Sequence, residues 1–176
     1  LLPALAAAMT RSEHEVQKVV VSRPVAPLHP AEVEFEAFLA SASPAAKPAA
    51  TGGDDPGFWL YSSGSTGRPK GTVHSHANPY WTCELYGKRV LGLTERDVCF
   101  SAAKLFFAYG LGNALTFPLS VGATVILMAE RPTPDATFKR WTGGIGGIKP
   151  TVFYGAPTGF AGMLASPNLP KRGDVA

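Results

Sequence analysis

Residues 61–71 carry the side chains best suited to chemistry, because they combine hydroxyl groups, glycines and a lysine in one short stretch. They read Tyr-Ser-Ser-Gly-Ser-Thr-Gly-Arg-Pro-Lys-Gly and follow the apolar run 58–60. Glycines adopt positive φ and let backbone N–H groups approach an anion closely. Hydroxyl groups donate hydrogen bonds without adding charge, and a lysine supplies a mobile cation. We predict that this loop binds the phosphates of a nucleotide through Ser62, Ser63, Gly64, Ser65, Thr66, Gly67 and Lys70.

Other interpretations of this loop exist. It does not follow the G-x-x-x-x-G-K-[ST] pattern of P-loop nucleotide triphosphatases, because Gly64 is followed five residues later by Pro69. A flexible Ser/Gly surface loop without a ligand is the plainer alternative. The apolar lead-in and the Arg-Pro-Lys-Gly ending favour a loop built for a ligand.

The pattern beyond residue 55 alternates short apolar runs with helical stretches. We expect strands over 58–61, 97–102, 123–128 and 151–154. We expect helices over 80–89, 112–120, 133–141 and 158–164, the first of them opened by Asn78 as N-cap and Pro79 at the first helical position. Strands that alternate with helices imply crossover connections. The predicted fold class is therefore α/β, with a mainly parallel sheet and flanking helices.

Three parts can be separated along the chain. Residues 1–41 contain an expected strand over Val16–Val21 and an amphipathic helix over about Glu32–Leu39. Residues 42–55 are rich in Ala, Ser, Pro and Gly, which is typical of a linker or surface loop. Residues 56–176 form the predicted α/β core.

Composition excludes several classes of function. The chain has 176 residues, 45% of them hydrophobic, and no apolar run nears the roughly 18 residues that cross a bilayer. The net charge of +3 comes from scattered basic pairs, so a nucleic-acid surface is not expected. Cys83 and Cys99 lack metal-binding spacing, and two unpaired thiols suit a reducing cytoplasm. We expect His74 and His76 to order the junction after the loop rather than to bind a metal.

The segment from Ser62 to Gly71 resembles, position by position, the signature phosphate loop of adenylate-forming enzymes. This superfamily comprises acyl-CoA synthetases, peptide-synthetase adenylation domains and luciferases. Residues 104–113, 114–123 and 151–158 are similar to those of benzoate-CoA ligases specifically. The resemblance covers nearly everything from about Asp54 to Pro167.

The resemblance implies a two-step reaction. A small aromatic carboxylic acid attacks the α-phosphate of Mg²⁺-bound ATP, and the thiol of coenzyme A then displaces AMP from the acyl-adenylate. The phosphate loop would position and neutralise the leaving phosphates, with Lys70 and Thr66 as the catalytic candidates. No protein ligand to a metal is assigned.

A second segment of the resembled enzymes, some forty residues after the loop, lines the carboxylic-acid pocket. The corresponding residues here are Phe107, Ala108, Tyr109 and Gly110. Small residues leave room for a flat ring, and a tyrosine can stack against it. Adjacent aromatic residues such as Phe106 and Phe107 are also common in protein cores, so a packing role for them stays open.

The resemblance also points to segments expected beyond Ala176. These are the Tyr-Gly-x-Thr-Glu segment, the ribose-binding aspartate and the small domain that carries the adenylation lysine. We therefore expect the chain to be an internal fragment of the large N-terminal domain of a ligase, inactive alone. The alternatives are a ligase for hydroxy- or aminobenzoate, a phosphate-binding module without chemistry, and a structural fragment.

Overall fold

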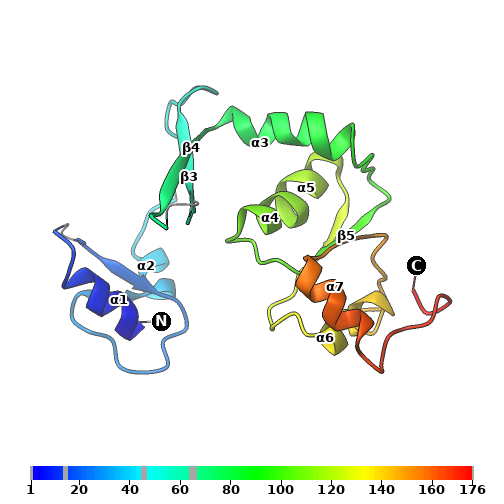
Figure 1. The fold of residues 1–176 in the computed structure, drawn as a ribbon. Coiled ribbons are helices and arrows are strands. Elements are labelled where there is room, and N and C mark those ends of the chain that lie inside the picture. Colours follow the sequence, from blue (N-terminus) through cyan, green and yellow to red (C-terminus); the bar gives the residue numbers. More distant parts are fainter. Residues whose placement is uncertain (1, 14–15, 45–46, 64–66, 176) are drawn as a thin grey trace. The chain divides into compact units, whose positions relative to one another are not determined.

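The computed structural model describes residues 2–13, 16–44, 47–63 and 67–175 (Figure 1). The chain forms two compact units, Leu1–Ala50 and Thr51–Ala176. Their boundary falls inside the stretch 42–55, for which the sequence predicts a linker. The division into three parts stays a prediction.

The first unit pairs two short strands with two helices. Its elements are α1 (Leu2–Met9), β1 (Val19–Val21), β2 (Glu32–Glu34) and α2 (Phe35–Ala40). β1 and β2 are parallel, with Val20 opposite Val33. The predicted strand 16–21 is therefore shorter than expected, because its partner offers only three residues.

The predicted helix over 32–39 is wrong at its first three residues, which form β2. The side chain of Glu34 explains the change of conformation. Its carboxylate accepts a hydrogen bond of 2.9 Å from the backbone N–H of Ala37. Glu34 is thus the N-cap of α2, which starts at Phe35.

The second unit begins with an antiparallel hairpin of β3 (Pro56–Ser62) and β4 (Lys70–Ser75). The predicted strand over 58–61 is confirmed as part of β3. The sequence pattern does not predict β4, because its residues Lys-Gly-Thr-Val-His-Ser are mostly exposed and form no apolar run. The stretch 61–71 therefore begins at the end of β3 and finishes at the start of β4.

A three-stranded parallel sheet forms the centre of this unit. Its strands are β5 (Val98–Ser101), β6 (Thr124–Ile126) and β7 (Val152–Tyr154), in the order β6-β5-β7. The predicted strands at these positions and their parallel pairing are confirmed. Cys99 and Phe100 in the middle strand are fully buried.

Helices cover both faces of this sheet. The helices of this unit are α3 (Ala77–Thr82), α4 (Ala108–Leu111), α5 (Phe117–Val121), α6 (Pro134–Trp141) and α7 (Pro157–Leu164), with the π-helical segments η1 (Cys83–Lys88) and η2 (Gly112–Thr116). Cys99 and Tyr154 face the α5 side, where they pack with Leu93, Phe117 and Val121. On the other face, the ring of Phe153 packs edge-on against two aromatic rings. Its centroid lies 4.9 Å from that of Trp141 in α6 and 5.8 Å from that of Phe160 in α7. In Figure 1, α4 and α5 accordingly lie on one side of β5 and α6 and α7 on the other.

The predicted start of α3 is wrong by two residues. His76 occupies the N-cap position, and Asn78 lies inside the first turn. The Asn78 carboxamide oxygen instead accepts hydrogen bonds from the backbone N–H of Ser75 at 3.2 Å and from its hydroxyl at 2.5 Å. An asparagine before a proline therefore closes the preceding turn here.

The helix predicted over 112–120 is longer than expected. It starts at Ala108 and continues without a break through η2 to Val121. Pro118 lies in the first turn of α5 and has no N–H to donate to the turn before it. A missing bond of this kind accommodates the wider π-helical turn at η2. The predicted helices 133–141 and 158–164 are confirmed as α6 and α7.

None of the helices in the described ranges has the length and apolar character needed to span a bilayer.

The two cysteine thiols are both buried and free, which gives a test of the packing. Burial raises the pKa of the Cys99 thiol, so it stays protonated and unreactive in mildly alkaline solution. The Cys83 thiol donates to the Thr116 carbonyl at 3.2 Å. We expect neither thiol to react rapidly with a disulfide reagent at about pH 8 in the native protein, and both to react in denaturant. Rapid labelling of Cys99 before unfolding would contradict the buried sheet.

Candidate functional site

The hairpin brings the two ends of the phosphate loop together. Ser62 at the end of β3 lies opposite Lys70 at the start of β4. Ser62, Ser63, Gly67 and Lys70 are all exposed. Gly64, Ser65 and Thr66, which the sequence assigns to the same loop, lie outside the described residues. The structure therefore places hydroxyl groups and an ammonium at one end of a two-stranded ladder.

Glycine is favoured at two positions of this loop for two different structural reasons. Gly67 has a φ of 74°, in the left-handed region that favours glycine, and a Cβ there would have open space around it. A Cβ on Gly71 would lie 3.0 Å from the Tyr61 ring, which covers it from the opposite strand. The first glycine serves backbone conformation, and the second serves close cross-strand packing.

The two histidines after the loop have local roles. The His74 ring stacks on Phe58 across the hairpin, with centroids 4.9 Å apart. His76 lies at the N-cap position of α3. Across the described residues, no group of three or more His, Cys, Asp or Glu side chains could hold a metal ion.

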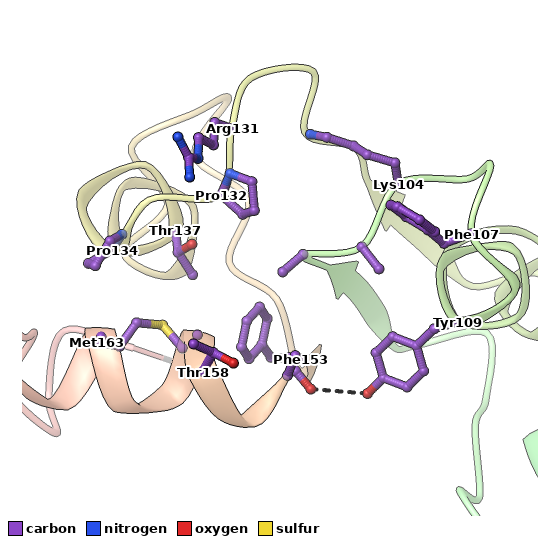
Figure 2. A pocket seen from close by; sticks show the side chains of 16 residues that line it. Lys104, Phe107, Tyr109, Arg131, Pro132, Pro134, Thr137, Phe153, Thr158 and Met163 are labelled. Atoms are coloured by element: carbon purple, nitrogen blue, oxygen red, sulfur yellow. Dashed lines mark hydrogen bonds between the residues drawn. The ribbon is translucent and has the colours of Figure 1, made fainter. Parts of the chain in front are cut away.

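A cavity of about 500 Å³ lies where β5 and β7 end and the chain leaves β6 (Figure 2). Ligands of open α/β sheets bind at this carboxyl edge of the strands. The wall is mostly apolar. Its side chains include Lys104, Phe107, Tyr109, Arg131, Pro132, Pro134, Thr137, Phe153, Thr158 and Met163.

The four predicted acid-binding residues have different positions. Phe107 and Tyr109 line the cavity, and the Tyr109 hydroxyl donates to the Gly155 carbonyl at 3.2 Å. Ala108 lines a second hollow of about 280 Å³, which Tyr109 also borders. Gly110 is buried and lines neither. The structure therefore brings three of the four to two adjoining hollows.

Gly110 has a steric role that the sequence did not suggest. A Cβ at this position would lie 2.0 Å from the backbone oxygen of Lys104. Only glycine lets the start of α4 pass so close to the preceding loop. This approach holds Tyr109 at the cavity wall.

Sequence reasoning missed the basic residues beside the cavity. The Lys104 ammonium donates to the backbone carbonyls of Met128 and Glu130. Arg140, with 5% of its surface exposed, donates to both carboxylate oxygens of Glu130 at 2.7 and 3.0 Å. These bonds hold the pKa of Glu130 below its usual value. The available signal was Lys104 itself, the single charged residue of the stretch 102–128.

The chain matches the family model described as "AMP-binding enzyme" over residues 2–175. It belongs to this family. The chain is 57% identical over 144 residues to the benzoate–CoA ligase of Thauera aromatica, a match that covers 82% of this chain and 27% of that protein. It is 47% identical to the 4-hydroxybenzoate–CoA/benzoate–CoA ligase of Rhodopseudomonas palustris over 77% of this chain and 25% of that protein.

Solved structures give the same assignment. A benzoate CoA ligase from Burkholderia xenovorans superposes with a TM-score of 0.74 and 63% identity, covering 90% of this chain and 29% of its own. An anthranilate CoA ligase in complex with anthranoyl-AMP superposes with a TM-score of 0.81 and 32% identity. This match covers 96% of this chain and 31% of that protein. The resemblance to adenylate-forming benzoate-CoA ligases is confirmed, and so is an α/β fold that is part of such a ligase. The chain spans about a quarter of the length of the curated relatives above.

Replacing Gly110 by alanine tests the close approach at the start of α4. The new Cβ must displace the Lys104 carbonyl, so we expect the free energy of unfolding to fall by about 1–3 kcal/mol, as for other overpacked sites. Denaturant unfolding measures it. Gly159→Ala in α7 is the matched control, since a Cβ there meets nothing within 4 Å. Equal stability of Gly110→Ala and the unaltered protein would contradict the geometry.

Proposed function

We propose that the enzyme of which this chain forms a part activates benzoate with ATP and transfers the benzoyl group to coenzyme A. The products are benzoyl-CoA, AMP and pyrophosphate. The observation that carries this proposal is the 57% identity to a protein named benzoate–CoA ligase over most of the chain. The apolar cavity beside two aromatic side chains supports an aromatic acid as the substrate.

The phosphate loop would act on ATP in the first step. As the benzoate carboxylate attacks the α-phosphate, negative charge develops on the departing pyrophosphate. Hydroxyl and backbone N–H donors of the loop, together with Lys70, would hold that charge in place. We assign this binding to Ser62, Ser63, Gly64, Ser65, Thr66, Gly67 and Lys70, with Thr66 and Lys70 as the catalytic members.

Mg²⁺ enters this proposal as the counter-ion of ATP. The donors of the loop are hydroxyl, N–H and ammonium groups, which suit phosphate oxygens, and the loop contains no carboxylate, the protein ligand typical of Mg²⁺. We therefore assign no ligand to Mg²⁺ within this chain. The metal would neutralise phosphate charge when it is bound with the nucleotide.

The aromatic acid would bind beside Phe107, Ala108, Tyr109 and Gly110. The Tyr109 ring is fixed by its bond to the Gly155 carbonyl, which suits offset or edge-on stacking against a flat ring. The methyl side chain of Ala108 leaves room beside it, and Gly110 allows the backbone that carries Ala108 and Tyr109 to pass Lys104.

We also place the enzyme in the cytoplasm, because two free cysteines persist there as thiols.

A hydroxy- or aminobenzoate is the second candidate substrate. The hollow beside Ala108 is also bordered by Asn113 and Tyr154, both buried. The buried phenol oxygen of Tyr154 lies beside the Cys99 thiol, a weak partner, and meets no other hydrogen-bonding group in the described part of the chain. Burial also raises the pKa of this phenol, so it remains a neutral donor. Such groups favour a ligand with a polar ring substituent.

Pyrophosphate release by the full-length enzyme tests the reaction and its substrate together. We expect ATP-dependent release to be greatest with benzoate, lower with hydroxy- and aminobenzoates, and absent with short fatty acids. The isolated 176-residue chain serves as a control, and we expect it to release no pyrophosphate. A maximum with a substituted benzoate would favour the second candidate. No release with any acid would overturn the ligase proposal and leave a phosphate-binding module.

Lys70→Ala tests the loop within the full-length enzyme. Loss of one charge-assisted contact to phosphate costs about 1.5–3 kcal/mol, so kcat/KM for ATP should fall about 10- to 150-fold. Lys88→Ala is the matched control, because Lys88 is exposed and pairs with Glu84 on the surface. Unchanged ATP kinetics in Lys70→Ala would remove this residue from the mechanism.

A further inference from the structure

Lys104 connects two opposite walls of the cavity. Its backbone carbonyl accepts a hydrogen bond of 3.0 Å from the N–H of Phe107, which lines one wall. Its ammonium donates to the carbonyls of Met128 and Glu130, in the segment that leaves β6. Residues 127–132 of this segment, hereafter the β6 exit segment, supply the other wall through Arg131 and Pro132. Figure 2 shows the Lys104 side chain reaching from the Phe107 side toward this segment.

A buried arginine holds the β6 exit segment from a second direction. Arg140 of α6 donates to both carboxylate oxygens of Glu130, and its Nη1 also donates to the Ala136 carbonyl at 3.0 Å. Its guanidinium carbon lies 6.0 Å from the centroid of the Phe100 ring, which is fully buried in the sheet. The arginine is therefore fixed by its own helix and by the core.

Glu130 is held by both of these cations. Lys104 binds its backbone oxygen, and Arg140 binds its carboxylate. The next two residues, Arg131 and Pro132, line the cavity directly. The position of their wall relative to Phe107 and Tyr109 thus depends on two side chains that do not take part in the proposed reaction.

We propose that Lys104 is a positioning residue that sets the width of the cavity, with the Arg140–Glu130 ion pair as its second anchor. By fixing the distance between the Phe107 wall and the Pro132 wall, it limits the size of the aromatic acid that the enzyme accepts. This inference rests on the proposed ligase function and on binding of the acid in this cavity. An ammonium suits the task, because it offers three donors to carbonyl groups that converge from different directions.

Lys104→Met in the full-length enzyme tests this role. Methionine has a similar length but no donor, so the two carbonyls lose their partner and the β6 exit segment is released. We expect the ratio of kcat/KM for benzoate to that for 4-methylbenzoate to fall about tenfold, the scale on which a pocket resolves one methyl group. KM for ATP should stay within about twofold. Lys104→Arg keeps the cation and its donors and should restore most of the ratio.

Control variants separate positioning from general destabilisation. A merely structural role would lower activity toward both acids by the same factor and leave their ratio unchanged. Lys139→Met removes an exposed lysine next to Arg140 and should not move the ratio. Arg140→Lys keeps the charge but loses the two-pronged bond to Glu130, so the ratio should fall in the same direction.

The outcomes are distinguishable. An unchanged ratio in both Lys104→Met and Arg140→Lys would overturn the positioning role. If Lys104→Met does not fold, Arg140→Lys alone decides the question by the same ratio. Absence of acid-dependent pyrophosphate release in the unaltered enzyme would instead overturn the proposed ligase function, on which the positioning role rests.

Discussion

Parallel pairing of β5 between β6 and β7 is the constraint on which the second unit depends. It buries Cys99 and Phe100 completely and gives each face of the sheet its own layer of helices. Parallel strands also end at one common edge. The segments that leave β5, β6 and β7 therefore meet there, although they are distant in sequence. The cavity is a direct result of this topology.

Much of the central sheet could be predicted from local pattern. Short apolar runs marked β5, β6 and β7, and the pattern also predicted the helix over 133–141. The structure adds its N-cap, Thr133, whose hydroxyl accepts from the Ala136 N–H. Elements defined by a distant partner could not be predicted in this way. β2 is a strand because β1 lies beside it, and β4 is one because β3 does. Their own residues carry no apolar alternation that would reveal the pairing.

The candidate site likewise has residues that a local pattern predicts and residues whose roles depend on distant parts of the chain. The residue types of the phosphate loop predicted anion binding without any structure. The aromatic segment predicted a pocket role for Phe107 and Tyr109, and both line the cavity, although their binding of the acid stays a prediction. The steric role of Gly110 and the bonds of Lys104 were not predicted, since they need the backbone path. Lys104 reaches a carbonyl 24 residues away, and Arg140 a carboxylate 10 residues away. Such contacts depend on how strands are ordered, which spacing alone does not reveal.

Tyr109 borders both hollows at the edge of the sheet, so its ring is a shared partition. A ligand that turns this ring must break the 3.2 Å bond to the Gly155 carbonyl and change the space on both sides at once. The shape of each hollow therefore depends on the orientation of one tyrosine ring, which a single hydrogen bond holds.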